Sequence, residues 1–225
     1  MASDNDIILR AGGIRHTYTA DGVETPVLHG IDLAVRRGEF LMVMGPSGCG
    51  KTTLLNILGL MMRPTAGTVE IEGRAVQGLN DAARTALRRN KLGFVFQRFN
   101  LLPVLSAEQN VAMTLKLRRE SVNGQAVQAL DRVGLSAKRR HKPGALSVGE
   151  QQRVAIARAI VGRPSVLLAD EPTGNLDSRN ASMVLDLIAG LNRTDGLTIV
   201  MITHNEHLTD RADRVLQMRD GRFEK

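Results

Sequence analysis

Apolar and polar residues alternate in short runs along the first third of the chain, as they do in β-strands. Runs of this kind, separated by Gly or Pro, cover residues 7–9, 14–17, 31–35 and 68–71. A continuous apolar run at residues 40–44 ends in a glycine-rich turn, and the mixed apolar pattern of residues 51–62 is typical of a buried helix. We therefore predict several strands around one buried helix in this part of the chain.

From residue 80 onward the apolar residues recur with a helical period. The pattern predicts helices at residues 81–89, 107–118, 125–133, 149–161 and 181–191. The spacing of Ser106 and Gln109 predicts a capping box at the start of the second of these helices.

Short apolar runs precede and follow the last of these helices. Residues 166–169 and 199–202 suit parallel strands buried on both faces of a central sheet, and the helix between them completes a β-α-β unit. A further strand is predicted at residues 92–96, and Asp220 with Gly221 predicts a hairpin turn between the last short strands. The predicted class is α/β, with a mainly parallel sheet, an N-terminal antiparallel β layer and a helical insertion.

The composition changes this picture little but limits the partners. Of the 225 residues 43% are hydrophobic, as in ordinary folded proteins, and 30 Lys and Arg against 23 Asp and Glu give a formal charge of +7. A basic excess attracts nucleic acid, anionic lipid or phosphorylated ligands, or it simply belongs to a solvated surface. Trp is absent and Tyr occurs once, which disfavours the stacking platforms of single-strand nucleic-acid binders.

Three features bear on location. The single cysteine, Cys49, cannot form an internal disulfide, and this fits a reducing compartment. The first ten residues are polar and acidic and do not predict a signal peptide. No apolar run approaches the ~20 residues needed to cross a bilayer. We therefore expect any membrane role to depend on a partner.

Residues 45–52 read Gly-Pro-Ser-Gly-Cys-Gly-Lys-Thr and match the P-loop pattern at every fixed position, between a predicted strand and a predicted helix. The glycines let backbone N–H groups turn toward phosphate oxygens, and the helix N-terminus adds partial positive charge. Lys51 is expected to reach the β- and γ-phosphates, and the Thr52 hydroxyl to ligate Mg²⁺. By itself the motif indicates a P-loop NTPase, a class that includes kinases, GTPases and helicases.

Two acids follow the apolar strand at residues 166–169. A buried strand that ends in carboxylates delivers negative charge to a metal at the sheet edge, so Asp170 is expected to hold Mg²⁺ directly or through water. Glu171 is placed to act as the general base that polarises the attacking water. An acidic loop after a core strand is common, but the same chain also supplies the phosphate loop that needs such a partner.

The stretch Leu-Ser-Val-Gly-Glu-Gln-Gln-Arg at residues 146–153 resembles the signature motif of ABC ATPases. The P-loop, Gln97, this signature, the acidic strand and His204 follow one another in the order of that family, so the resemblance covers essentially the whole chain. It implies a single domain (residues 1–225), with a catalytic core and β layer at residues 1–96 and 162–225. Residues 97–161 would form the helical signature subdomain.

The resemblance also implies roles for single residues. Gln97 would sense the γ-phosphate and Mg²⁺, and His204 would contact the γ-phosphate and orient water with Glu171. Tyr18 would stack on adenine; the alternative is an ordinary aromatic of the β layer. The predicted catalytic residues are Lys51, Glu171 and His204, and the predicted metal ligands are Thr52, Gln97 and Asp170. Predicted nucleotide contacts are Tyr18, Gly45, Pro46, Ser47, Gly48, Cys49, Gly50, Lys51, Thr52, Thr53, Gln97, Ser147, Gly149, Glu150, Asn175 and Asp177.

In family members ATP is held between the P-loop of one copy and the signature segment of another. The resemblance therefore implies an ATP-dependent homodimer that uses ATP and Mg²⁺, hydrolyses ATP to drive transport, and works beneath separate membrane-spanning subunits. Such a protein would be cytoplasmic, held peripherally at the inner membrane, with no nucleic-acid partner.

The chain departs from the family at two signature positions. Val148 replaces the usual Gly, and Glu150 replaces a common Gln. A β-branched side chain restricts the backbone at position 148, and Glu150 is expected to add an anion near ATP that Arg153 partly offsets. We expect nucleotide binding to survive and turnover to change.

The strings around residues 93–103 and 169–178 resemble the bacterial group that contains lipoprotein-releasing, macrolide-exporting and cell-division ABC ATPases. The apolar segment at residues 99–105 would line a groove for a helix of the membrane partner, or would pack inside the helical insertion. An ABC ATPase acting on nucleic acid or ribosomes is the main alternative, favoured only by the basic charge. A small-molecule P-loop kinase would leave the signature and His204 unexplained.

Overall fold

The computed structural model describes residues 6–122 and 124–224. The prediction that the first ten residues form no signal peptide therefore falls partly on residues 1–5, which lie outside the described residues. The strands are β1 (Ile7–Ala20), β2 (Val23–Arg36), β3 (Phe40–Met44), β4 (Ala66–Ile71), β5 (Arg74–Ala75), β6 (Leu92–Val95), β7 (Val166–Asp170), β8 (Thr198–Thr203), β9 (Arg214–Arg219) and β10 (Arg222–Phe223). The α-helices are α1 (Lys51–Leu58), α2 (Asp81–Lys91), α3 (Ala107–Arg118), α4 (Gln125–Arg132), α5 (Val148–Ile160) and α6 (Ser178–Asp195).

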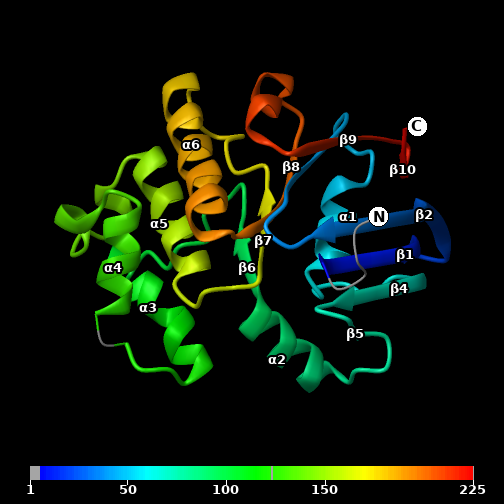
Figure 1. Cartoon of the computed structure of the whole chain (residues 1–225), viewed down its shortest axis with the longest axis horizontal. Coiled ribbons are helices and arrows are strands. Elements are labelled where there is room, and N and C mark those ends of the chain that lie inside the picture. The colour runs from blue at the N-terminus through cyan, green and yellow to red at the C-terminus, as the bar shows by residue number, and fades with distance from the viewer. Residues whose placement is uncertain (1–5, 123, 225) are drawn as a thin grey trace.

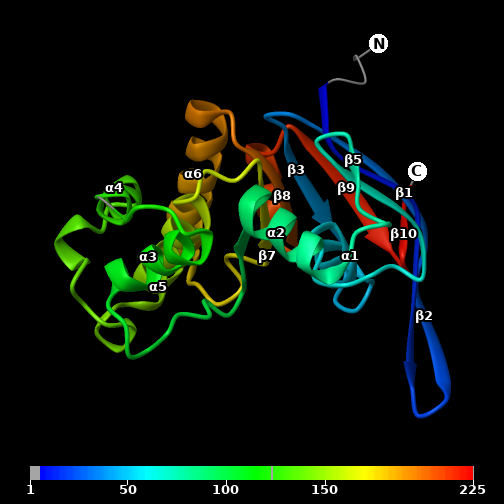
Figure 2. The same cartoon turned by 90° about the horizontal axis from the view of Figure 1, so that it is seen from below.

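The N-terminal strands form an antiparallel sheet in the order β2-β1-β4-β5. The strands predicted at residues 7–9 and 14–17 are parts of the single strand β1, which shifts register against β2 between Ala11 and Ile14. The two glycines between those residues tolerate the irregularity that divided the apolar pattern. Figure 2 shows the β1–β2 hairpin projecting well beyond the rest of the sheet.

A second sheet has the order β10-β9-β3-β8-β7-β6, and all its strands except β10 run parallel. Successive side chains of a strand point to opposite faces, and this divides the apolar residues between two cores. Phe40 and Met42 of β3 join the core under α6 and the helical insertion, whereas Leu41 and Val43 face α1 and the antiparallel sheet. The predicted double burial of the central strands is confirmed.

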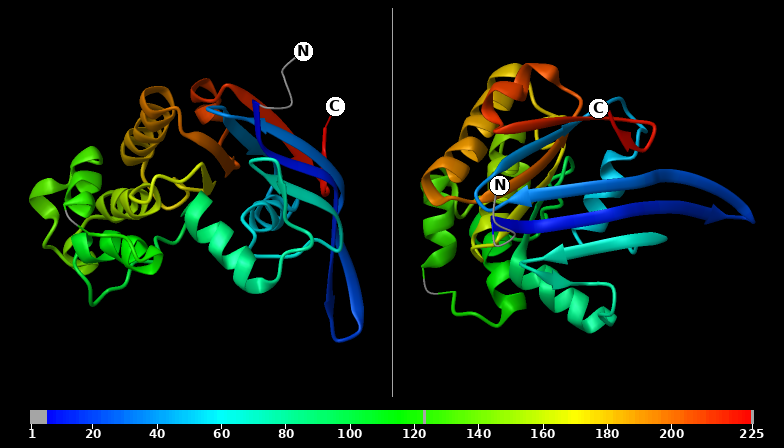
Figure 3. Two further views of the ribbon diagram at one scale, coloured as in Figure 1. Left: turned by 60° about the horizontal axis from the view of Figure 1, so that its bottom comes forward. Right: turned by 45° about the vertical axis from the view of Figure 1, so that its right-hand side comes forward.

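The helices lie on both sides of the parallel sheet (Figures 1 and 3). Helix α1 lies between it and the antiparallel sheet, while α3, α4 and α5 pack on one another at the other end of the molecule. The predicted α/β class, antiparallel layer and helical insertion are confirmed. None of the helices in the described part of the chain is both long and apolar enough to span a membrane.

Several helix ends differ from the sequence prediction. Helix α1 ends at Leu58 and not at residue 62, because the chain turns at Gly59 and Leu60 takes a φ of 58°. Helix α6 starts at Ser178, where the Asp177 side chain caps it, and so extends beyond the apolar residues that defined the prediction. The capping box of Ser106 and Gln109 is confirmed at the start of α3.

Candidate nucleotide-binding site

The carboxyl ends of four adjacent parallel strands gather most of the predicted site residues. In the order β3-β8-β7-β6, these strands lead into the P-loop, His204, the pair Asp170 and Glu171, and Gln97. Parallel strands present their carboxyl ends on one edge, which is where ligands of open α/β sheets bind. Segments that are up to 159 residues apart in the chain (204 − 45) therefore meet along one edge.

The P-loop needs glycine at its first position. Gly45 has a φ of 153°, and a Cβ there would lie 2.0 Å from the carbonyl oxygen of Met218 on β9. The Lys51 side chain is buried, and its Nζ donates to the carbonyl oxygens of Gly45 (2.7 Å) and Pro46 (2.8 Å). The ammonium therefore lies inside the curve of the loop, where a phosphate would be surrounded by positive charge.

Tyr18 lies beside the helix that follows this loop. Its hydroxyl is 3.2 Å from the Thr53 hydroxyl of α1, and its ring makes an edge contact with His16 at a centroid distance of 4.7 Å. With 41% of its surface exposed, Tyr18 is not a core aromatic.

The two acids after β7 have different environments. The Thr52 hydroxyl donates to Asp170 Oδ1 over 3.4 Å. Burial raises the pKa of the Asp170 carboxyl above its ordinary value and Glu171 adds to this, while the Thr52 hydrogen bond and Lys51 act in the opposite direction. A half-buried carboxylate that lacks a strong cationic partner is a natural ligand for a divalent cation.

Glu171 and His204 form a pair at the ends of β7 and β8. Glu171 Oε1 lies 3.0 Å from His204 Nδ1, and the Glu171 backbone N–H donates to Ile202 O over 3.0 Å. Glu171 adopts a φ of 44°, a left-handed conformation that costs a non-glycine residue of order 1–3 kcal/mol. Such local strain clusters at functional sites, and here it turns the carboxylate toward the histidine.

Gln97 sits at the same edge beyond β6. Its carbonyl oxygen accepts a hydrogen bond from Asn175 Nδ2 over 2.9 Å, and its side chain passes close to Gly174, where a Cβ would lie 2.8 Å from Nε2. The structure thus joins two predicted site residues, Gln97 and Asn175, through a direct contact.

The signature segment opens α5. Ser147 is its N-cap and forms a capping box with Glu150: Ser147 Oγ accepts from the Glu150 N–H over 3.2 Å, and Glu150 Oε2 accepts from the Ser147 N–H over 2.8 Å. This backbone hydrogen bond lowers the pKa of Glu150, and Lys138 lies 3.9 Å from its other oxygen. The predicted anion is thus a carboxylate that holds its own helix end, and it is offset by Lys138 as well as by Arg153.

Gly149 packs closely against the first turn of α6. A Cβ at Gly149 would lie 2.6 Å from Asn180 Oδ1, so glycine is needed for close approach to α6 and not for a positive φ. Asp177 caps α6 by accepting from the Asn180 N–H (2.8 Å) and from Asn180 Nδ2 (2.7 Å). Val148 is 47% exposed at the first position of α5, where it meets no crowding from the core.

Two polar residues of α5, Gln152 and the half-buried Arg158, have no role in the sequence prediction. Gln152, fully buried, donates from Nε2 to the carbonyl oxygen of Pro172, the residue after Glu171, over 2.7 Å. Arg158 donates to the carbonyl oxygens of Phe99 (2.7 Å) and Asn100 (2.5 Å), and burial lowers its pKa. A polar residue on a helix gives no sign in the sequence of which distant carbonyl it reaches.

The P-loop helix α1 and the signature helix α5 lie in different parts of one chain (Figures 1 and 2). The described hydrogen bonds connect the P-loop, β7, β8 and Gln97 with one another, and the signature with the loops after β7. A single copy therefore offers a phosphate loop and, separately, a capped helix N-terminus.

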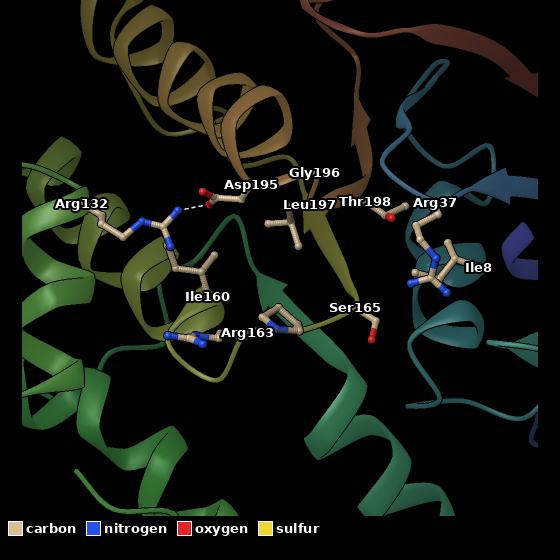
Figure 4. Close-up of a pocket in the computed structure, with 11 residues that line it drawn as sticks. Ile8, Arg37, Arg132, Ile160, Arg163, Ser165, Asp195, Gly196, Leu197 and Thr198 are labelled. Carbon is tan, nitrogen blue, oxygen red and sulfur yellow. Dashed lines mark hydrogen bonds and ion pairs between the residues drawn. The ribbon is translucent and has the colours of Figure 1, made fainter. Parts of the chain in front are cut away.

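A cavity of about 570 Å³ lies at the other edge of the parallel sheet, where β7 and β8 begin (Figure 4). It contains none of the predicted site residues. Arg132 is paired with Asp195 there, and Arg37 lies across the cavity from Arg132 and Arg163. Because the three guanidinium groups do not converge, this cavity has no clear anion-binding geometry.

Comparison with known proteins gives consistent matches. The family model described as ABC transporter matches residues 28–174. The lipoprotein-releasing system ATP-binding protein LolD 1 of Rhodopseudomonas palustris is 46% identical over 221 residues, 96% of this chain and 98% of that protein. The macrolide export ATP-binding/permease protein MacB of Syntrophobacter fumaroxidans is 47% identical over 94% of this chain, which covers 30% of that longer protein. A dimeric, post-hydrolysis structure of the ATP-binding cassette MJ0796 bound to ADP and Pi superposes with a TM-score of 0.89 at 38% identity, covering 96% of this chain and 97% of the other.

Proposed function

This chain belongs to the ABC transporter family as an ATP-hydrolysing, ATP-binding subunit, and we propose that it drives a membrane-spanning partner in the release or export of lipoprotein-like cargo. The observation that carries the proposal is the single sheet edge at which Lys51, Asp170, Glu171 and His204 meet. The cargo class rests on the similarity to the lipoprotein-releasing ATP-binding proteins over nearly the full length of both chains.

The site residues fit the chemistry of phosphoryl transfer to water, which depends on positioning and electrostatics. Lys51 would stabilise the charge on the β- and γ-phosphates, since its ammonium already lies inside the loop. Glu171 would accept a proton from the attacking water at Oε1 or Oε2, and His204, 3.0 Å away, would orient that water and contact the γ-phosphate. Tyr18 would stack on adenine.

The residues also fit Mg²⁺, a hard cation that prefers oxygen ligands and keeps several waters. Thr52 Oγ1 and Asp170 Oδ1 are 3.4 Å apart, and Gln97 ends the neighbouring strand segment on the same edge. When bound, Mg²⁺ would neutralise charge on the phosphates. The protein oxygens of Thr52, Asp170 and Gln97 would hold it directly or through water.

The second half of the site would come from another copy of the chain. The N–H groups at the start of α5, capped by Ser147, would face the γ-phosphate held by the partner's P-loop. Asp177 and Asn175 would lie at the same interface, because Gly149 packs directly on Asn180. The dimeric cassette structures among the relatives support this arrangement.

Glu171→Gln tests the base and the dimer together. The variant should lose ATP hydrolysis but keep ATP binding, so that light scattering shows ATP converting monomer to dimer. Glu24→Gln, on the exposed hairpin strand β2, is the matched control and should hydrolyse ATP normally. Normal hydrolysis by Glu171→Gln would show that the base lies elsewhere.

The membrane subunit would dock in an apolar groove of about 640 Å³ between α2 and α3, with β6 as its floor. Phe94 and Phe96 stack there at a centroid distance of 5.7 Å, and Leu117 is 61% exposed. Both interpretations of residues 99–105 apply, each to a different residue: Leu102 lines the groove, whereas Leu101 packs inside against the core. An amphipathic helix of the partner fits such a groove.

Leu117→Asp should abolish co-purification of the membrane subunit in detergent, because it places a charge in the groove. Val23→Asp adds the same charge at another exposed apolar residue, on the remote hairpin, and should leave co-purification intact. Equal recovery of the membrane subunit with both variants would argue against this groove.

The remaining parts of the proposal follow from this docking. The chain would lie on the cytoplasmic face of the inner membrane, held there by its partner. Residues 97–161 would act as a helical signature subdomain attached to a catalytic core of residues 1–96 and 162–225, and the mutual packing of α3, α4 and α5 supports this division.

A further inference from the structure

Five successive residues before the signature, Lys-Arg-Arg-His-Lys at positions 138–142, form the strongest concentration of basic side chains in the sequence. Lys138 lies 3.9 Å from Glu150, and Arg139 lies 3.8 Å from Glu108. Arg140 and Lys142 are exposed, and in the described part of the chain neither side chain has an ion-pair or hydrogen-bond partner. Two uncompensated cations therefore remain at the surface.

The backbone holds this basic run against the start of α3. The N–H of Ala107 donates to His141 O over 2.8 Å, and the N–H of Glu108 donates to Arg139 O over 3.0 Å. The residues just before α3, which include Leu102 of the apolar groove, therefore lie close to the basic run.

An exposed apolar turn lies immediately before Ala107. Val104 has 73% of its surface exposed, the largest fraction among the exposed large apolar side chains, and Leu102 is 44% exposed. The turn is rigid: Asn110, 1% exposed, accepts from the Leu102 N–H over 2.7 Å, and its Nδ2 donates to the carbonyl oxygens of Leu102, Leu105 and Ser106 at 3.0–3.1 Å. A buried amide thus fixes apolar side chains in contact with water.

From this combination we infer that Leu102, Val104, Arg140 and Lys142, here called the basic–apolar patch, bind the anionic headgroup surface of a lipid bilayer. Basic side chains beside an anionic leaflet attract it, while small apolar side chains enter the headgroup region. The position of the patch supports a membrane occupant, because Leu102 belongs both to the patch and to the groove. That the patch faces the membrane rests on the proposed docking of the membrane subunit, whereas its affinity for an anionic bilayer does not.

Arg140 and Lys142 are two of the 30 Lys and Arg residues behind the chain's formal charge of +7. The patch ties lipid contact to the signature, since the basic run leads directly into Ser147 through a short 3₁₀ turn, Pro143–Ala145. The ATPase would thus contact the bilayer itself and not only through its partner.

The test uses the full chain alone, mixed with vesicles of phosphatidylcholine that contain about one third phosphatidylglycerol, followed by flotation. A basic residue near an anionic membrane contributes roughly 1 kcal/mol, which is about fivefold in affinity, so Arg140→Gln/Lys142→Gln should bind about 25-fold more weakly. Arg74→Gln/Arg193→Gln removes the same charge from exposed positions on β5 and α6, and should bind like wild type. Binding should fall as salt rises and be absent on pure phosphatidylcholine. Val104→Ser should weaken binding at low and high salt alike.

Several results would overturn the inference. Wild type that does not float with anionic vesicles, or a double variant that floats as well as wild type, would show that the patch is only a solvated surface. If the double variant instead loses the membrane subunit in detergent while neither protein binds vesicles, the basic residues contact protein. Failure of the groove proposal would show separately, as unchanged co-purification of the membrane subunit with Leu117→Asp in detergent, where no bilayer is present.

Discussion

The contact between Gly149 and Asn180 gives a sharp test of how the signature helix is fitted to α6. In Gly149→Ala the new Cβ would lie 2.6 Å from Asn180 Oδ1 and 2.9 Å from its Cγ, so the Asn180 side chain must move. Overpacking of this kind costs about 1–3 kcal/mol, and it also displaces the Asn180 Nδ2 bond to Asp177 (2.7 Å) at the exposed start of α6. The better helix propensity of Ala returns up to about 1 kcal/mol. We expect a net loss of about 1–2 kcal/mol in the free energy of unfolding.

A double-mutant cycle separates this clash from other effects. Asn180→Ala removes the two nearest atoms and leaves only its Cβ, 3.3 Å from the new methyl group. In that background Gly149→Ala should be neutral or slightly stabilising, so the effect changes sign or vanishes. Gly190→Ala on α6, where a Cβ meets nothing within 4 Å, is the control and should stabilise by up to about 1 kcal/mol.

Urea denaturation of the four proteins of the cycle measures the coupling, and steady-state ATP hydrolysis shows whether shifting α5 against Asp177 impairs the site. The same destabilisation by Gly149→Ala with Asn180 present or absent would refute the reasoning, because the cost would then not come from this contact.

Four further predictions follow from the described contacts. Tyr18→Ala should weaken ATP binding about tenfold, measured by a fluorescent ATP analogue, while Tyr18→Phe should bind normally; equal losses would mean that the hydroxyl and not the ring matters. Glu150→Ala should reduce stability by about 0.5–2 kcal/mol through loss of the capping box with Ser147. Because the pKa of Glu150 is lowered in the folded state, its negative charge stabilises the fold above pH 4.5, the ordinary pKa, and this contribution is lost as the pH falls through the lowered pKa. The difference in stability between wild type and Glu150→Gln should therefore be largest at neutral pH and shrink in acid. Asn110→Ala should cost about 2–4 kcal/mol by thermal or urea unfolding, since the Leu102 N–H and the Leu105 carbonyl lose their partner and the Leu102 and Ser106 carbonyls keep only a backbone one; a cost below about 1 kcal/mol would mean that the turn re-forms its bonds. Val148→Gly should change the ATPase rate at saturating ATP, and an unchanged rate would mark the substitution as neutral.

The order of motifs along the chain was enough to identify the family and the α/β class, and both are confirmed. The P-loop could be read from the sequence because its chemistry is local. Glycines at fixed spacing, a lysine and a helix start all lie within eight residues, so backbone conformation alone produces the site. Capping was local as well, and the box of Ser106 and Gln109 was predicted correctly.

The second box, Ser147 with Glu150, has the same spacing but was read as an electrostatic departure at the nucleotide site. The structure shows its carboxylate bonded to the backbone of its own helix. The signature motif led to a prediction about nucleotide binding, whereas the i to i+3 spacing of Ser147 and Glu150 indicates a helix cap.

What the tertiary structure alone decided is which distant groups meet. The fit of Gly149 against Asn180 and the bond from Gln152 to Pro172 join residues on different elements, and the pairing of Glu171 with His204 was implied only by the resemblance to ABC ATPases. No periodicity along the chain encodes such contacts, because they depend on strand order and on how helices pack. Local sequence therefore determined the elements and the phosphate loop, and the packing of those elements determined the site around it.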